Sequence, residues 1–187
     1  MLASVAVLML GFSLPERPWS VALTPHVGVT VIDDGRFATD KTRTLISAGG
    51  SLELGFRPIP WVRVLAIGFG VLHENNTSLV DGGQSGIVGG MAGLESLVPI
   101  GLVEISAGLA AGPAWIHRQA GRVCRETCSY LVDIYADVGV ITPTLGVSVQ
   151  NPQWPWLQLG AVLRAVVPLG EETAVHLHLG VRVEARF

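Results

Sequence analysis

The last fifteen residues of the chain, 173–187, alternate between apolar and polar side chains almost without exception. Successive side chains of an extended strand point to opposite faces, so this period of two predicts a β-strand with one apolar and one polar face. The chain ends on the aromatic residue Phe187. The polar face carries two histidines, two arginines and a glutamate: His176, His178, Arg182, Glu184 and Arg186. The apolar face must therefore meet either a protein core or lipid.

The composition narrows the fold class. Of 187 residues, 49% are apolar and only 14% are charged, against roughly 25% charged residues in an average soluble domain. No apolar run reaches the ~20 residues that a transmembrane helix needs. The 23 glycines and 11 prolines favour β-structure over a helical bundle. The net charge of −3 gives no reason to expect nucleic-acid binding.

The N-terminal segment has features of an export signal. Residues 2–10 form an apolar stretch, and Ser20-Val21-Ala22 is a small-x-small motif that a signal peptidase could cleave. No basic residue precedes the apolar stretch, which leaves open that the segment belongs to the mature protein. We expect residues 1–22 to be a signal peptide or a truncated export segment, and residues 23–187 to form one domain.

The rest of the chain divides into eight extended stretches of roughly ten or more residues, close to the ~9–11 residues of a transmembrane strand. Short, proline-bearing connections follow the second, fourth and sixth stretches, whereas longer polar connections follow the first, third and fifth. This asymmetry predicts an all-β, antiparallel, up-and-down transmembrane barrel. The predicted strands are 19–32, 43–57, 61–73, 86–98, 101–116, 130–149, 154–167 and 173–187.

Two stretches depart from a simple pattern. In the third, Arg63 shares its parity with the apolar Leu65 and Ile67, which we interpret as an arginine at the membrane boundary whose head group extends to the interface. In the sixth, the apolar set changes parity near Pro143, which predicts a β-bulge.

The tryptophans give an independent indication. Trp19, Trp61, Trp154 and Trp156 fall at the ends of strands beside the short connections, and Trp115 falls near the longer ones. A soluble core would draw these side chains to the strand centres, whereas membrane-spanning strands place them at the two interfaces. The tryptophans therefore favour the membrane barrel.

Together, the eight alternating stretches, the uneven connections, the tryptophans and the terminal strand resemble the small eight-stranded outer-membrane barrels, the OmpA/OmpX-like group. The resemblance covers about residues 23–187 and points to no particular member. It implies an integral protein of the bacterial outer membrane, a monomer in contact with membrane lipid and lipopolysaccharide. In that family the barrel-assembly machinery reads a terminal aromatic residue, a role that the resemblance gives to Phe187.

The inward polar faces predict the character of the lumen. An eight-stranded barrel is only wide enough for its own side chains, so opposite charges inside it should pair and close it. We expect a non-conducting lumen and a structural or surface-interaction role, with a narrow channel as the alternative. The predicted ion-pair residues are Glu53, Glu95, Glu104, Asp133, Asp137, Arg164, Arg182, Glu184 and Arg186.

The histidines raise the questions of metal binding and catalysis. Closure of the barrel would bring His26 of the first strand near His176 and His178 of the last. Three imidazoles could bind a transition metal, or they could be hydrogen-bonded members of the polar interior. No Ser/His/acid set stands out, and a lipid-facing His-x-Ser pair, as in deacylase barrels, is absent from the His176-Leu177-His178 segment. We expect no cofactor and no catalytic residue, and keep a lipid-modifying enzyme as an alternative.

The two cysteines, Cys124 and Cys128, lie in the third long connection and predict a disulfide in an exported protein. The same connection carries His117 and three arginines, which either contact lipopolysaccharide phosphates or are simply solvated. A soluble, lipocalin-like barrel with a bound apolar ligand is a further alternative. It would reverse the two faces, leaving barely one charged residue per strand on its surface.

Overall fold

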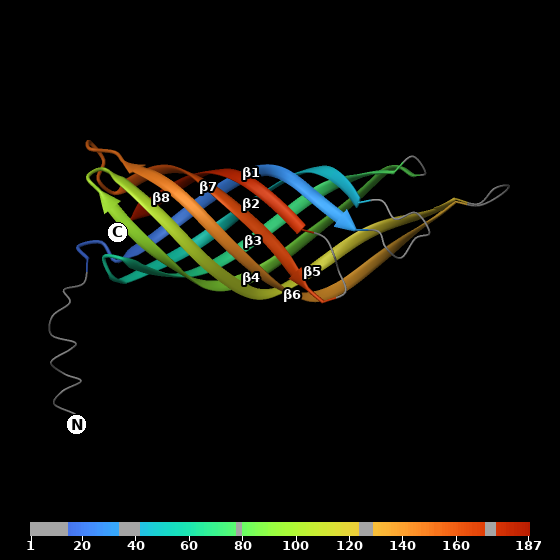
Figure 1. Cartoon of the computed structure of the whole chain (residues 1–187), viewed down its shortest axis with the longest axis horizontal. Coiled ribbons are helices and arrows are strands. Elements are labelled where there is room, and N and C mark those ends of the chain that lie inside the picture. The colour runs from blue at the N-terminus through green and yellow to red at the C-terminus, as the bar shows by residue number, and fades with distance from the viewer. Residues whose placement is uncertain (1–14, 34–41, 78–79, 124–128, 171–174) are drawn as a thin grey trace, which may run out of the picture.

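The computed structural model of the chain describes residues 15–33, 42–77, 80–123, 129–170 and 175–187, and in this part eight strands form a closed antiparallel barrel (Figure 1). The predicted fold class is confirmed. Within the same residues, no helix is long and apolar enough to cross a membrane. The strands are β1 (Trp19–Asp33), β2 (Thr42–Ile59), β3 (Val62–Thr77), β4 (Val80–Ile100), β5 (Val103–Val123), β6 (Ser129–Gln150), β7 (Leu157–Leu169) and β8 (Val175–Arg186).

The first and last strands close the barrel. Their pairing runs from Ser20 opposite Arg186 to Val31 opposite Val175. At the C-terminal end the backbones of Trp19 and Phe187 exchange two hydrogen bonds, of 3.1 and 3.0 Å. Closure of this kind satisfies the backbone groups that an open sheet edge would expose. Residues 19–22 are part of β1, so the predicted domain boundary after Ala22 falls inside a strand.

The three short connections lie at the end of the barrel that carries the C-terminus (Figure 1). Between β4 and β5, Gly101 has a φ of 63°, a conformation that glycine adopts without steric cost. Between β6 and β7, the side-chain Oδ1 of Asn151 accepts a hydrogen bond of 2.9 Å from the backbone N–H of Gln153. At the other end, β5 and β6 continue as a paired hairpin as far as Val123 and Ser129, so much of the predicted third long connection is strand.

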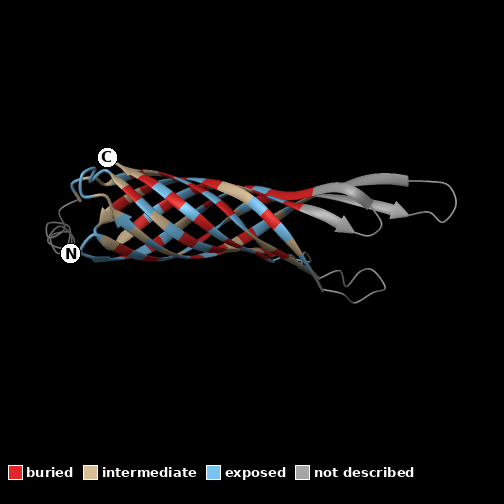
Figure 2. Cartoon of the chain, turned by 90° about the horizontal axis from the view of Figure 1, so that it is seen from above, coloured by how far each residue is buried: buried red, intermediate tan, exposed pale blue. Residues whose placement is uncertain are grey.

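Exposure alternates along the strands and shows which face is which (Figure 2). In β8 the polar His176 to Glu184 series is buried, whereas the apolar Val175 to Val183 series is exposed. The same arrangement in β2 leaves Ile46 83% exposed. In these two strands the apolar face lies outside and the polar face inside, opposite to the arrangement that the lipocalin-like alternative requires.

The bulge predicted for the sixth strand is wrong. No bulge occurs at Pro143, because the β5–β6 register continues unbroken from Val103–Val149 to Val123–Ser129. From Ala136 to Gln150 the residues of one parity face inward, and Val140 is buried in the lumen. The sequence pattern changes there because the inward side chains are apolar in one part of the strand and polar in the other. The parity of the residues that face inward stays the same.

The interpretation of Arg63 is also wrong. Its side chain is only 1% exposed and points into the lumen, with Leu65 and Ile67 on the same buried face. The mixed character of this face reflects two zones of the interior: a charged zone toward the short turns, and an apolar core further along. The core consists of Leu65, Ile67, Phe69, Val71, Ile87, Met91, Ala110, Ala114, Ile116, Val140 and Val166.

Candidate functional site: the polar lumen

Arginine and glutamate side chains from six strands fill the charged zone of the lumen. Each of these side chains is buried or nearly so; the most exposed, Arg186, has a side-chain exposure of 12%. We call this set the ion-pair network. Among the described residues it comprises Arg57, Arg63, Arg164, Arg182, Arg186, Glu53, Glu95, Glu104 and Glu184.

Two arginines form the centre of the network. Arg63 of β3 pairs with Glu95 of β4 and also reaches Glu184 of β8. Arg182 of β8 pairs with Glu53 of β2 and lies 3.2 Å from Glu95. Each of these two arginines thus contacts carboxylates from two different strands. The network therefore crosses the lumen and does not merely follow the wall.

Further pairs extend the network on both sides of this centre. Arg164 donates to Glu53 at 2.6 Å and to the hydroxyl of Ser51 at 2.7 Å. Toward the short turns, Arg57 and Glu104 form a bidentate pair with two hydrogen bonds of 2.8 Å. Bidentate geometry of this kind is the strongest form of the guanidinium–carboxylate contact.

Arg186 connects the C-terminal strand to the same region. It lies 2.7 Å from Glu104 and 3.1 Å from Glu184, and it also donates to Gln158. Removing a buried charge from water is costly unless partners compensate it, and here each carboxylate of the network has at least two arginine partners. Each arginine of the network likewise has at least one carboxylate partner, so every charge in it faces an opposite charge.

The structure brings together seven of the nine predicted lumen residues: Glu53, Glu95, Glu104, Arg164, Arg182, Glu184 and Arg186. Asp137 is exposed on the outer face, opposite Trp115 in the β5–β6 register, so its assignment to the lumen is wrong. The assignment failed because it assumed a bulge in this strand. The strand is continuous, and in a continuous strand Asp137 has the outward parity. The side chain of Asp133 lies outside the described part of the structure.

Sequence reasoning missed Arg57 and Arg63. Arg57 is the last residue of the predicted second strand and shares the parity of the inward Glu53, but it was not included among the predicted ion-pair residues; in the structure β2 extends to Ile59. Arg63 had been assigned to the membrane boundary because apolar residues follow it on the same face. For Arg57, the parity it shares with Glu53 was a usable signal, whereas for Arg63 the apolar residues of the same parity concealed the inward direction.

The histidines lie further from the short turns. His26 and His178 stack with their ring centroids 4.5 Å apart, and the centroids of His176 and His178 are 6.1 Å apart. His73 of β3, which the sequence did not single out, lies 5.8 Å from His176. We call these four residues the histidine cluster. Closure of the barrel thus places His26 beside the last strand.

Hydroxyl groups and glycines surround the histidine cluster. His178 Nε2 is 2.8 Å from Ser47 Oγ, and His176 Nδ1 is 2.8 Å from Thr30 Oγ1. A Cβ atom on Gly49 would lie 2.7 Å from His26 Nε2, so glycine provides the space for the stack. Within the described residues, no group of three or more His, Cys, Asp or Glu side chains is arranged to hold a metal ion. Of the two alternatives for these histidines, the described residues show the hydrogen-bonded one, with hydroxyl contacts and ring stacking.

The five tryptophans are exposed at the surface. Trp19, Trp61, Trp115, Trp154 and Trp156 are between 46% and 55% exposed. Trp19 also packs on Phe56 with the ring centroids 4.6 Å apart. Phe187 is exposed, with its backbone held by β1. The two cysteines, Cys124 and Cys128, lie outside the described residues.

This geometry defines the class of fold: a small eight-stranded barrel of the outer-membrane type, as the resemblance predicted. The chain is similar to Neisserial surface protein A (NspA), with a TM-score of 0.63 and 13% identity over 90% of this chain and 97% of that one. It is also similar to Ail, the attachment invasion locus protein of Yersinia pestis, with a TM-score of 0.58 and 13% identity over 91% and 99% of the two chains. No protein-family model and no curated protein sequence matches the chain. At these identities the likeness establishes the fold.

Proposed function

We propose that the chain is an integral protein of the bacterial outer membrane with a closed lumen and a structural or surface-interaction role. The observation that carries the proposal is the inverted polarity of the wall: Arg63 is 1% exposed inside, whereas Ile46 is 83% exposed outside. Exposed apolar side chains occur on all eight strands. In water they would form an apolar surface far larger than soluble monomers carry, whereas lipid solvates them.

The contents of the lumen support closure. The ion-pair network crosses the lumen in the half nearer the short turns, and the side chains of the apolar core fill the lumen further along. A conducting path needs a continuous column of water, and buried side chains occupy both zones. We therefore propose a barrel that does not conduct ions.

The hairpin at the far end supports an interaction role. β5 and β6 continue past the other strands there (Figure 1), and residues 117–125 contain His117, Arg118, Arg122 and Arg125. Ail, a protein of the same fold, has been crystallised with the heparin analogue sucrose octasulfate. We propose that the basic segment of this chain contacts lipopolysaccharide phosphates, since arginine pairs well with phosphate. Assembly would use β8 and Phe187 as the signal for the barrel-assembly machinery, and the product would be a monomer.

Fractionation and gel mobility test this proposal. The protein should sediment with outer membranes, require detergent for extraction, and migrate differently in gels with and without heating, because a closed barrel resists unfolding by detergent. Recovery of folded protein in the aqueous phase without detergent would refute the membrane assignment. Planar-bilayer recordings then test closure, and a steady open conductance would support the narrow-channel alternative.

A further inference from the structure

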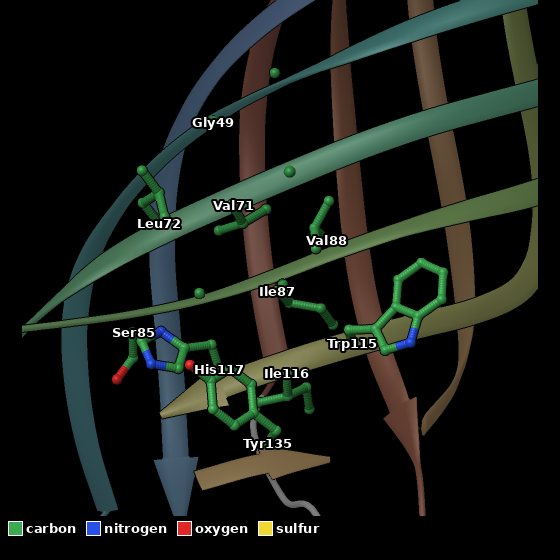
Figure 3. Close-up of a pocket in the computed structure, with 13 residues that line it drawn as sticks. Gly49, Val71, Leu72, Ser85, Ile87, Val88, Trp115, Ile116, His117 and Tyr135 are labelled. Atoms are coloured by element: carbon green, nitrogen blue, oxygen red, sulfur yellow. The ribbon is translucent and has the colours of Figure 1, made fainter. Parts of the chain in front are cut away.

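A groove of ≈ 610 Å³ lies in the wall formed by β2 to β6 (Figure 3). Among the residues that line it, Val71 and Ile87 are buried and belong to the apolar core, whereas the residues between and beside them point outward. The outward-facing lining side chains are Leu72, Val88, Trp115 and Tyr135, each more than half exposed. The groove, which we call the outer groove, therefore opens on the outside of the barrel.

Glycines form the floor of the outer groove. Gly50 of β2 is opposite Gly70 of β3, Gly70 is opposite Val88, and Val88 is opposite Trp115. A Cβ atom on Gly70 would meet no atom within 4 Å, so the space above this residue is open. With strands ~4.8 Å apart, the row from Gly50 to Trp115 is about 14 Å long.

The chemistry of the lining is that of a hydrocarbon site with one polar end. None of the described residues that line the groove is Asp, Glu, Lys or Arg. His117 and Tyr135 stack with ring centroids 4.9 Å apart, and they lie together, away from Gly49 (Figure 3). An apolar chain over the glycine floor would thus have two hydrogen-bonding side chains near one of its ends.

We propose that the outer groove binds one acyl chain of a membrane lipid, with the lipid head group at the end marked by His117 and Tyr135. The proposal rests on the proposed function, because only a wall immersed in lipid presents the groove to acyl chains. The groove is continuous with the exposed apolar surface of the barrel, so bilayer lipid is the molecule that reaches it. The groove is concave, and a concave apolar site contacts a chain on more than one side.

Two glycines on the same strand provide a matched pair of variants. Gly70 lines the groove, whereas Gly68, two residues away on the same outward face of β3, does not. A Cβ atom at either position meets nothing within 4 Å, so neither substitution creates a clash at the wall. Gly70→Leu fills the groove, and Gly68→Leu adds the same side chain outside it. Gly50→Leu fills the groove from the neighbouring strand and provides a second test should Gly70→Leu fail to fold.

The experiment titrates the full-length barrel, folded in detergent micelles, with phosphatidylcholine brominated in its acyl chains, and follows quenching of tryptophan fluorescence. We expect wild type and Gly68→Leu to show a component that saturates at about one lipid per barrel. Gly70→Leu and Gly50→Leu should weaken this component at least about tenfold, and Trp115→Phe should remove it while the other tryptophans respond only gradually. Native mass spectrometry should retain one lipid on wild type and Gly68→Leu, and none on the groove-filling variants.

The outcomes separate this inference from the proposed function. A folded, membrane-inserted wild-type barrel without the saturable component would overturn the acyl-chain site and leave the membrane assignment intact. Identical titrations of Gly70→Leu and Gly68→Leu would overturn it as well. Failure of the wild-type chain to fold in detergent or to insert into vesicles would instead count against the proposed function.

Discussion

Arg63 of β3 and Glu184 of β8 form a buried ion pair across the lumen, although 121 residues separate them in the sequence. These strands are not neighbours in the barrel, so the pair joins opposite parts of the wall. Both side chains are almost completely buried. The energetic consequences of this contact can be tested directly.

Glu184→Ala should destabilise the folded barrel by about 3–5 kcal/mol, because it removes a carboxylate that contacts Arg57, Arg63, Arg182 and Arg186 and so leaves buried positive charge uncompensated. Urea unfolding of the protein in lipid vesicles measures the change in the free energy of unfolding. Val183→Ala is the matched control: Val183 precedes Glu184 on β8 and faces outward. A loss at Glu184 no larger than the loss at Val183 would show that the network contributes little to stability.

Arg57→Lys tests the geometry of one pair while its charge is kept. Lysine cannot reproduce the two parallel hydrogen bonds of 2.8 Å from Arg57 to Glu104. The variant should lose about 1.5–3 kcal/mol of unfolding free energy, the usual value of a hydrogen bond to a charged group. Arg57→Ala should lose more. Equal stability of Arg57→Lys and wild type would mean that charge alone matters at this position.

Gly49→Ala should disturb the histidine cluster. A Cβ atom on Gly49 would lie 2.1 Å from the carbonyl oxygen of Gly70 and 2.7 Å from His26 Nε2, so backbone or rings must move. Overpacking of this kind costs roughly 1–3 kcal/mol. Gly68→Ala, at an open position on the outer face, should leave stability within about 0.5 kcal/mol of wild type. NMR signals of the His26 and His178 rings should shift in Gly49→Ala and remain in place in Gly68→Ala.

The fold was predictable because each strand of such a barrel has one face outside and one face toward a narrow lumen, which imposes a period of two. The last strand shows this most clearly, since its alternation from Val175 to Glu184 matches its burial residue by residue. Closure then follows from chain order, and it brings His26 beside His178.

The errors have one physical origin. We expected inward residues to be polar throughout, but apolar side chains occupy part of the lumen, including Val140 and Leu65. In β6 this led to an unnecessary bulge and to the misplacement of Asp137, and in β3 it led to the misplacement of Arg63. Parity alone cannot distinguish an apolar residue that faces lipid from one that fills the interior. The carboxylate partner of each arginine could not be predicted from the sequence either, because the pairing depends on side chains that cross the lumen.

Nitroxide scanning of β8 shows whether the apolar faces of the strands meet lipid. Single cysteines would be placed at positions 175 to 184 of a variant lacking Cys124 and Cys128, then spin-labelled and reconstituted into vesicles. The accessibility of each label to oxygen, which concentrates in lipid, would be compared with its accessibility to a water-soluble nickel complex. We predict oxygen maxima at Val175, Leu177, Leu179, Val181 and Val183, and low accessibility to both reagents at the intervening positions. High nickel accessibility at Leu177, Leu179 and Val181 would contradict the membrane barrel.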